Sequence, residues 1–245
     1  MKINSAFVFV TVLASAWQVA SAADITGTVT LNGTPPPERE ITPLMNDATC
    51  GKLHSGPVLT RFFTVGPNKE LADVVVMLKG VPGAAADASA KPVVLDQKGC
   101  LYMPQILAVQ KGQKLLVKNS DTLPIAMHNV HLNPLVEANS GGPNAGRLNM
   151  PQTPGAPDLV YTFPSAENFM KFQCDVHTWM FAWVTVVDSP YFAVTGKDGT
   201  FKISNVKPGK YTLTALHYKA AKAGVDKEIE VKDDGAKADF ALEVK

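Results

Sequence analysis

Several features are scarce in this sequence of 245 residues, and each scarcity excludes a class of function. Charged residues make up only 18% and the formal net charge is +1, which argues against nucleic acid or an anionic membrane as the main partner. Beyond the N-terminus no apolar run is long enough to span a bilayer. No paired carboxylates, serine–histidine arrangement or Gly-rich phosphate loop stands out, so we do not expect an enzyme.

Long apolar patterns at helical period are absent too, which removes the helical fold classes. The apolar residues, 46% of the chain, instead gather in short segments such as "ITGTVTLNG", "ADVVVMLKG", "FAWVTVVD" and "KYTLTALHY". These segments are rich in β-branched and aromatic residues, and Gly, Pro, Asn and Asp separate them. The pattern predicts an all-β protein built from sandwiches or barrels.

The N-terminal segment, residues 1–23, has the layout of a secretory signal peptide. Lys2 supplies the positive start, residues 6–19 the apolar run, and the small residues at 20–22 a cleavage site near Ala22 or Ala23. A membrane anchor is the alternative, but the apolar run is shorter than the ~20 residues that a spanning helix needs. We therefore expect an exported, periplasmic protein with no transmembrane span in the mature chain.

Only three cysteines are present, an odd number for an exported protein. Cys174 has a histidine and a methionine close by in the sequence, whereas Cys50 and Cys100 do not. The economical assignment is a Cys50–Cys100 disulfide with a free thiol at Cys174. The alternative is that Cys50 and Cys100 are both unpaired.

The two ends of the mature chain resemble parts of one module. "GTVTLNGTPPP" and "VVVMLKGV" near the start, and "AVTGKDGTFKISNVKPGKYTLTALH" near the end, resemble a carboxypeptidase-regulatory-like, transthyretin-like sandwich. We therefore expect an outer β-sandwich made of residues 24–80 and 189–245, with a second β-domain at 81–188 inserted into it. The alternative is an N-terminal domain to residue 188 followed by a small β tail, which would be marginal on its own.

The middle of the chain contains residues that commonly bind metals. "CDVHTWM" carries Cys174, His177 and Met180, and "HNVH" places His128 upstream at the end of a predicted strand. The stretch from "VVLDQKG" to "WVTVVD" resembles the cupredoxins, in which an early histidine precedes a Cys-x-x-His-x-x-Met loop, here with amicyanin-like spacing. The resemblance implies a Greek-key β-sandwich that binds one copper ion of type 1.

Carried over by position, the resemblance makes His128, Cys174 and His177 the equatorial ligands and Met180 the weak axial one. Two imidazoles, a thiolate and a long thioether are the blue-copper donor set, which suits both Cu(I) and Cu(II). Asn129 matches a residue that bonds near the thiolate and braces the ligand loop. Met180 could instead be a core residue, and Asn129 an ordinary turn residue.

Other residues compete for these roles. Strand alternation sends positions 128 and 131 to opposite faces, so only one of the two histidines should reach the metal. The resemblance selects His128 and leaves His131 beside the site or on the surface. Trp179, within the ligand loop, is either an exposed docking contact or packed against the loop.

The resemblance implies single-electron transfer with a redox partner protein, a dehydrogenase or a cytochrome. Copper storage or delivery through the same ligands is one alternative. A non-catalytic module that contacts glycans or the cell envelope through the outer sandwich, with a metal-stabilised inner domain, is another. A reversible one-electron couple would distinguish electron transfer from copper storage or delivery, and glycan binding by the metal-free protein would indicate the third function.

Overall fold

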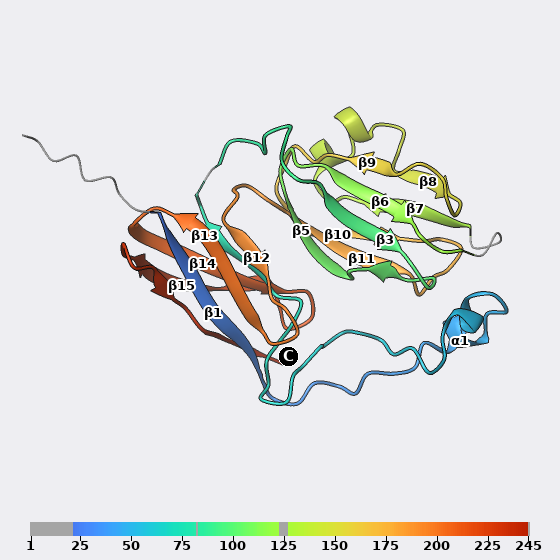
Figure 1. The fold of residues 1–245 in the computed structure, drawn as a ribbon, viewed down its shortest axis with the longest axis horizontal. Helices are drawn as coiled ribbons and strands as arrows, with labels where there is room; N and C mark the ends of the chain where they lie inside the picture. The colour runs from blue at the N-terminus through green and yellow to red at the C-terminus, as the bar shows by residue number, and fades with distance from the viewer. Residues whose placement is uncertain (1–21, 82, 123–126, 245) are drawn as a thin grey trace, which may run out of the picture.

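The computed structural model describes residues 22–81, 83–122 and 127–244, whose regular secondary structure is mostly β-strand (Figure 1). The prediction of an all-β fold is confirmed. The helices in these ranges are single turns: α1(Thr42–Asn46), η1(Cys50–Leu53), η2(Glu137–Asn139) and η3(Gly142–Asn144). None of the helices in the described ranges is long and apolar enough to cross a membrane. Residues 1–21 of the predicted signal peptide lie outside the described residues.

Strands from both ends of the chain form two sheets that enclose one apolar core, and we call this unit the outer sandwich. One sheet consists of β13(Thr200–Val206), β1(Ala23–Asn32) and β16(Ala236–Lys237), with β17(Phe240–Glu243) also paired to β1. The other has the order β12(Phe192–Val194), β2(Val75–Lys79), β14(Gly209–His217) and β15(Ala221–Val231).

Strands from the middle of the chain form two further sheets around a second core, the inner sandwich. The first has the order β5(Ile106–Gln110), β11(Phe181–Val187), β10(Glu167–Gln173), β7(His128–Asn133) and β8(Asn149–Gln152). The second has the order β4(Tyr102–Met103), β3(Val93–Gln97), β6(Leu115–Asn119) and β9(Leu159–Tyr161).

The strand sequences match the surfaces on which they lie. In β1, buried and less buried positions alternate, as expected for a strand with one face on a core. In β5, by contrast, the first four residues are all buried. Leu107 and Val109 face the inner core, while Ile106 and Ala108 belong to a third cluster between the sandwiches. The unbroken apolar run of β5 therefore reflects burial on both faces.

This third cluster joins the outer and inner sandwiches. Val75 of β2 and Leu216 of β14 pack in it with Ile106 of β5. The rings of Trp183 and Tyr218 lie 5.9 Å apart, centroid to centroid, within the same contact region. Apolar and aromatic packing of this kind holds the sheets of the two sandwiches against each other.

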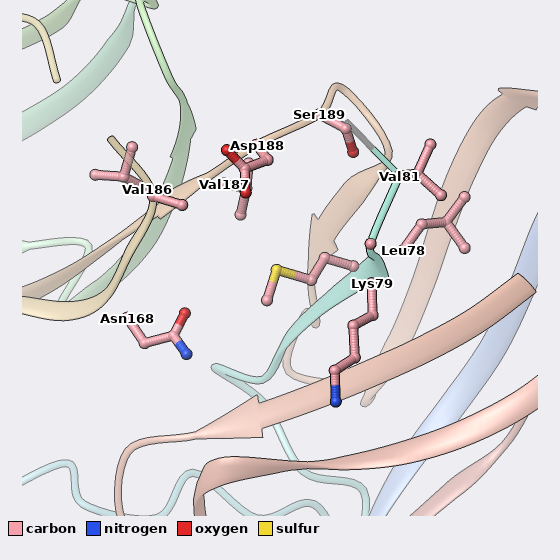
Figure 2. A pocket seen from close by; sticks show the side chains of 11 residues that line it. Leu78, Lys79, Val81, Asn168, Val186, Val187, Asp188 and Ser189 are labelled. Atoms are coloured by element: carbon pink, nitrogen blue, oxygen red, sulfur yellow. The ribbon is translucent and has the colours of Figure 1, made fainter. Parts of the chain in front are cut away.

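The chain enters the inner strands after β2 and leaves them before β12, and these two crossings run side by side. The amide of Gly83, on the first crossing, donates a hydrogen bond to the carbonyl of Asp188, on the second, at 3.3 Å. A crevice of about 420 Å³ lies at this junction, lined by Lys79, Val81, Asn168 and Asp188 among others (Figure 2). The strands of the inner sandwich are thus connected to the outer sandwich through two adjacent segments.

Residues 33–73, between β1 and β2, form a long extension that we call the capping arm. It runs from the outer sandwich to α1, beside the end of the inner sandwich, and returns (Figure 1). Its two branches pair through a hydrogen bond from the Ile41 amide to the Val58 carbonyl, 2.8 Å. Leu44 and Cys50, at its tip, are fully buried in the inner core. This arm was not expected from the sequence, in which residues 24–80 were predicted to belong to the outer sandwich alone.

Candidate metal centre

The loop between β10 and β11 brings Cys174, His177 and Met180 together at one end of the inner sandwich. The two strands are antiparallel neighbours, with Gln173 opposite Phe181 at the end of the ladder. The Cys174 amide donates to the Met180 carbonyl at 3.1 Å, and the Met180 amide donates to the His177 carbonyl at 2.8 Å. These bonds close the seven-residue connection, set Cys174 opposite Met180 and leave His177 between them.

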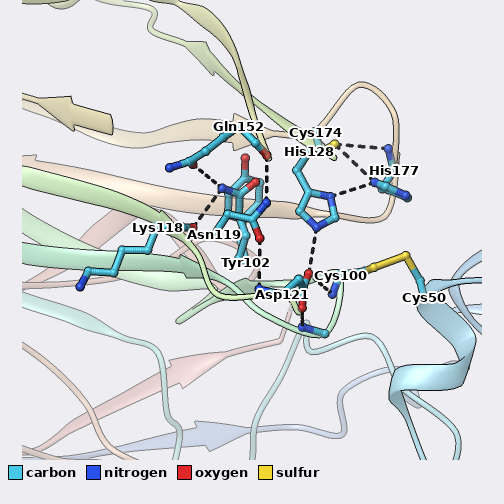
Figure 3. Close-up of polar contacts among 12 residues, drawn as sticks. Cys50, Cys100, Tyr102, Lys118, Asn119, Asp121, His128, Gln152, Cys174 and His177 are labelled. Carbon is cyan, nitrogen blue, oxygen red and sulfur yellow. Dashed lines mark hydrogen bonds and ion pairs between the residues drawn. A yellow bond between two sulfur atoms is a disulfide. The ribbon is translucent and has the colours of Figure 1, made fainter. Parts of the chain in front are cut away.

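His128 reaches the same point from a different strand. It is the first residue of β7, the neighbour of β10 in the sheet, and it is fully buried. Its Nδ1 lies 3.0 Å from Nδ1 of His177, which is 3.7 Å from Sγ of Cys174 (Figure 3). One donor atom from each of these residues falls within 4.8 Å of the others.

The separations of His177 from His128 and from Cys174 are short enough for one ion to contact both atoms of each pair. Typical bonds are about 2.0 Å to an imidazole nitrogen and about 2.3 Å to a thiolate. Two nitrogens on one ion therefore lie at most about 4 Å apart, and a nitrogen and a sulfur at most about 4.3 Å. The observed 3.0 Å and 3.7 Å are inside both limits. The Met180 side chain is fully buried in the core cluster that also contains Cys174.

The Cys174 thiol lies in surroundings that favour its thiolate. Burial alone would raise the pKa of Cys174, but hydrogen bonds from His128, His177 and Asn129 lower it from 9.0 to about 6. The His177 amide also points at Sγ, 3.4 Å away. A thiolate is the form of cysteine that binds metals.

Asp121 orients His128 and was not identified from the sequence. Its Oδ2 lies 2.9 Å from Nε2 of His128 and accepts the Cys100 amide at 3.0 Å. Although burial opposes ionisation, bonds from His128, Cys100 and Gly99 keep the pKa of Asp121 below its ordinary value. A carboxylate at Nε2 keeps a proton there, so Nδ1 offers its lone pair to a metal once the proton it shares with Cys174 has left. An aspartate shortly before the histidine, at the end of a predicted strand, was the available signal.

Asn129 links β7 to the ligand loop. Its Oδ1 accepts the Asp175 amide at 2.7 Å and lies 3.2 Å from Sγ of Cys174, while its Nδ2 donates to Asp175 at 2.9 Å. The Tyr102 hydroxyl donates to its carbonyl at 2.9 Å. These bonds hold Asn129 beside the sulfur in the arrangement that a bracing role requires.

His131 points away from the cluster. Its Nδ1 contacts the carboxylate of Asp175 at 2.9 Å, and both side chains are partly exposed. Asp175 also accepts bonds from Gln173 and Asn149, and these bonds, that from His131 foremost, lower its pKa to about 2. The strand alternation predicted from "HNVH" therefore separates a buried histidine from a surface one.

The tip of the capping arm covers the His177 side of the cluster. The predicted Cys50–Cys100 disulfide is present, with a Cα–Cα distance of 5.6 Å, and Cys174 carries a free thiol. The two bridged sulfurs and a ring nitrogen of His177 lie within 4.8 Å of one another. Trp179 is not an exposed docking contact: it is half-buried, and its indole nitrogen donates to the Cys100 carbonyl at 3.1 Å.

Comparison with known proteins gives partial likenesses. The sequence family described as "Polysaccharide lyase family 4, domain II" matches residues 176–239. An oxidized amicyanin mutant is 24% identical with a TM-score of 0.30 and covers 46% of this chain and 98% of its own. Amicyanin from Paracoccus versutus (Thiobacillus versutus) is 19% identical with a TM-score of 0.30, and the match covers 46% of this chain and 97% of that protein. The Cu-containing nitrite reductase of Thermus scotoductus SA-01 is 17% identical with a TM-score of 0.30, and the match covers 44% of this chain and 25% of that protein. No curated protein matches the sequence.

Proposed function

We propose that the chain binds one copper ion through His128, Cys174 and His177, with Met180 as a weak axial donor, and carries single electrons. The convergence of two imidazole nitrogens and one thiol, all buried, carries this proposal. Soft sulfur donors suit Cu(I) and imidazoles suit Cu(II), so this donor set supports both oxidation states. Copper supplies the reversible one-electron couple when it is bound.

The surrounding residues would keep the ligands in place in both oxidation states. Asp121 fixes the tautomer and rotation of His128, and Asn129 ties the Cys174 region to β7. The backbone bonds within the loop fix the positions of Cys174 and Met180. Preorganised ligands do not rearrange when the charge changes, and this keeps electron transfer fast.

The wider assignment rests on the same site. Four protein donors fill the usual blue-copper set, and for that reason we propose a carrier, with no catalytic role, that serves a dehydrogenase or a cytochrome. We also propose a periplasmic location, which the N-terminal segment, predicted to be a signal peptide, supports. The division into an outer domain (24–80 and 189–245) and an inserted domain (81–188) is supported by the pairing of the N-terminal strand β1 with the C-terminal strands β13 and β17.

Titration of the purified protein with Cu(II), followed by optical spectroscopy, tests the proposal. We expect one equivalent of Cu(II) to give an intense visible band from thiolate-to-copper charge transfer. The band should disappear in Cys174→Ser. His131→Gln is the matched control, since it removes a nearby histidine that faces away from the cluster, and it should keep the band. A colourless complex of the wild type, or an unchanged band in Cys174→Ser, would refute the assignment.

A further inference from the structure

We propose that reduction of the Cys50–Cys100 disulfide creates a second metal site, which binds Cu(I) through the two thiolates and His177. The two sulfurs and a His177 ring nitrogen already lie within 4.8 Å of one another. Cys50 and Cys100 are both fully buried, and His177 is 9% exposed. This site goes beyond the single-copper function, because its two sulfur donors are not used there.

The donor chemistry of the reduced form selects a soft cation. Two thiolates and an imidazole favour Cu(I) over hard cations such as Mg²⁺ or Ca²⁺. Nδ1 of His177 faces His128 and Cys174, so the second site would use Nε2, which must lose its proton for the ring to bridge two ions. Cys100 also lies within 4.8 Å of donor atoms of Asp121 and His128. The two sites thus adjoin through both histidines.

The two cysteines are held in place by contacts other than the sulfur–sulfur bond. The Cys50 amide donates to Oδ1 of Asp47 at 2.7 Å, and Leu44 anchors the arm tip in the inner core. The Cys100 amide donates to Asp121 at 3.0 Å, and the Cys100 carbonyl accepts the Trp179 indole at 3.1 Å. After reduction these contacts keep the two thiols facing each other.

The reductant is a dithiol, such as that of a thiol–disulfide oxidoreductase. One of its thiolates attacks a sulfur of the bridge, the bridge opens and a mixed disulfide forms. Its second thiol then displaces the remaining cysteine, so the reductant leaves as a disulfide and the protein gains two electrons and two protons. On binding, Cu(I) displaces those two thiol protons, and a third proton leaves Nε2 of His177 when both sites are filled.

Access to the bridge requires the arm tip to move. The backbone hydrogen bonds of α1 and η1 are local, such as Gly51 amide to Asp47 carbonyl at 3.0 Å, and the tip contributes no strand to either inner sheet. Segments without sheet bonds open at a lower free energy than the core. The side-chain bond between His54 and the Gly99 carbonyl, 2.8 Å, is one contact that must break.

Competition for Cu(I) against a chromophoric chelator tests the second site in the full chain. The protein is compared in its disulfide form and after reduction with a phosphine, which avoids added thiols. We expect one equivalent of tightly bound Cu(I) in the disulfide form and two in the reduced form. Mass spectrometry after iodoacetamide treatment then reports which cysteines the second equivalent protects. We expect protection at Cys50 and Cys100.

The outcomes separate this inference from the single-copper function. The inference would be overturned if reduction left the number of bound Cu(I) ions unchanged. It would also be overturned if a second Cu(I) ion bound while Cys50 and Cys100 were still fully alkylated. Protection of these cysteines together with no copper colour in the disulfide form would uphold it while refuting the proposed function. Cys50→Ser/Cys100→Ser should bind one equivalent in both conditions. If that variant does not fold, the wild-type comparison alone decides.

Discussion

The His217 imidazole makes a prediction about stability against pH that does not depend on any metal. His217 is fully buried at the end of β14 and stacks on Phe63, with ring centroids 5.3 Å apart. Its Nδ1 accepts the backbone amides of Lys219 and Ala220, at 3.3 and 3.1 Å. Its Nε2 has no hydrogen-bond partner among the described residues. Burial lowers the pKa of His217 from 6.5 to about 4, since a charged ring here would lose its hydration.

The sign and size of the effect follow from this pKa. Between pH 6.5 and 4 the unfolded chain binds a proton at His217 that the folded protein does not, so stability falls as the pH falls. Above pH 6.5 and below pH 4 both states carry the same charge on this group, and its contribution is flat. One pKa unit corresponds to about 1.4 kcal/mol. This residue should therefore lower the free energy of unfolding by about 2.5 kcal/mol between pH 7 and pH 4.5.

Urea unfolding at pH 7 and at pH 4.5 measures the effect, with His217→Gln and His217→Leu as neutral replacements. Each replacement carries its own cost at pH 7, because it loses the stacking on Phe63. Only the change between the two pH values matters, and we expect it to be about 2.5 kcal/mol smaller in both variants than in the wild type. Other acidic groups titrate equally in all three proteins. Parallel pH dependences in the wild type and both variants would refute the argument.

Three further predictions concern the metal end of the inner sandwich. Reduction of the Cys50–Cys100 disulfide, which spans 50 residues, should lower the free energy of unfolding by about 4 kcal/mol, as urea unfolding with and without reductant would measure. The copper colour should remain largely intact. Met180→Leu should keep the colour and raise the reduction potential, because a weaker axial donor stabilises Cu(II) less; an unchanged potential with a lower melting temperature would make Met180 a packing residue. Asp121→Asn should keep the colour but weaken copper binding about 10- to 100-fold, and unchanged affinity would contradict its orienting role.

Features encoded locally could be predicted from the sequence. Short β-branched segments between turn residues identify strands, and the alternation in "HNVH" separates the faces of His128 and His131. The disulfide could be predicted because disulfides form in exported proteins, and because the histidine and methionine near Cys174 left Cys50 and Cys100 as the pair. These predictions depend only on residues a few positions apart or on a count of cysteines.

Features that depend on distant contacts could not be predicted. The sequence of the capping arm did not distinguish it from the outer sandwich, because its position is set by the burial of Leu44 in the distant inner core. Asp121 became a candidate only when the fold brought its carboxylate to Nε2 of His128. The burial of Trp179 likewise depends on the Cys100 carbonyl, far from it in the sequence.

The pairing of β1 has a consequence for the order of folding. β1 pairs with strands at the opposite end of the chain, and the Thr28 amide bonds to Asp239 across 211 residues. The inner strands form a continuous block that can fold while β1 still lacks partners and remains exposed to unwanted pairing. Folding of that block brings the two crossings together at Gly83 and Asp188, which shortens the effective loop that β1 must close. Substitutions that slow folding of the inner sandwich should therefore lower the yield of the outer one, even though they lie outside it.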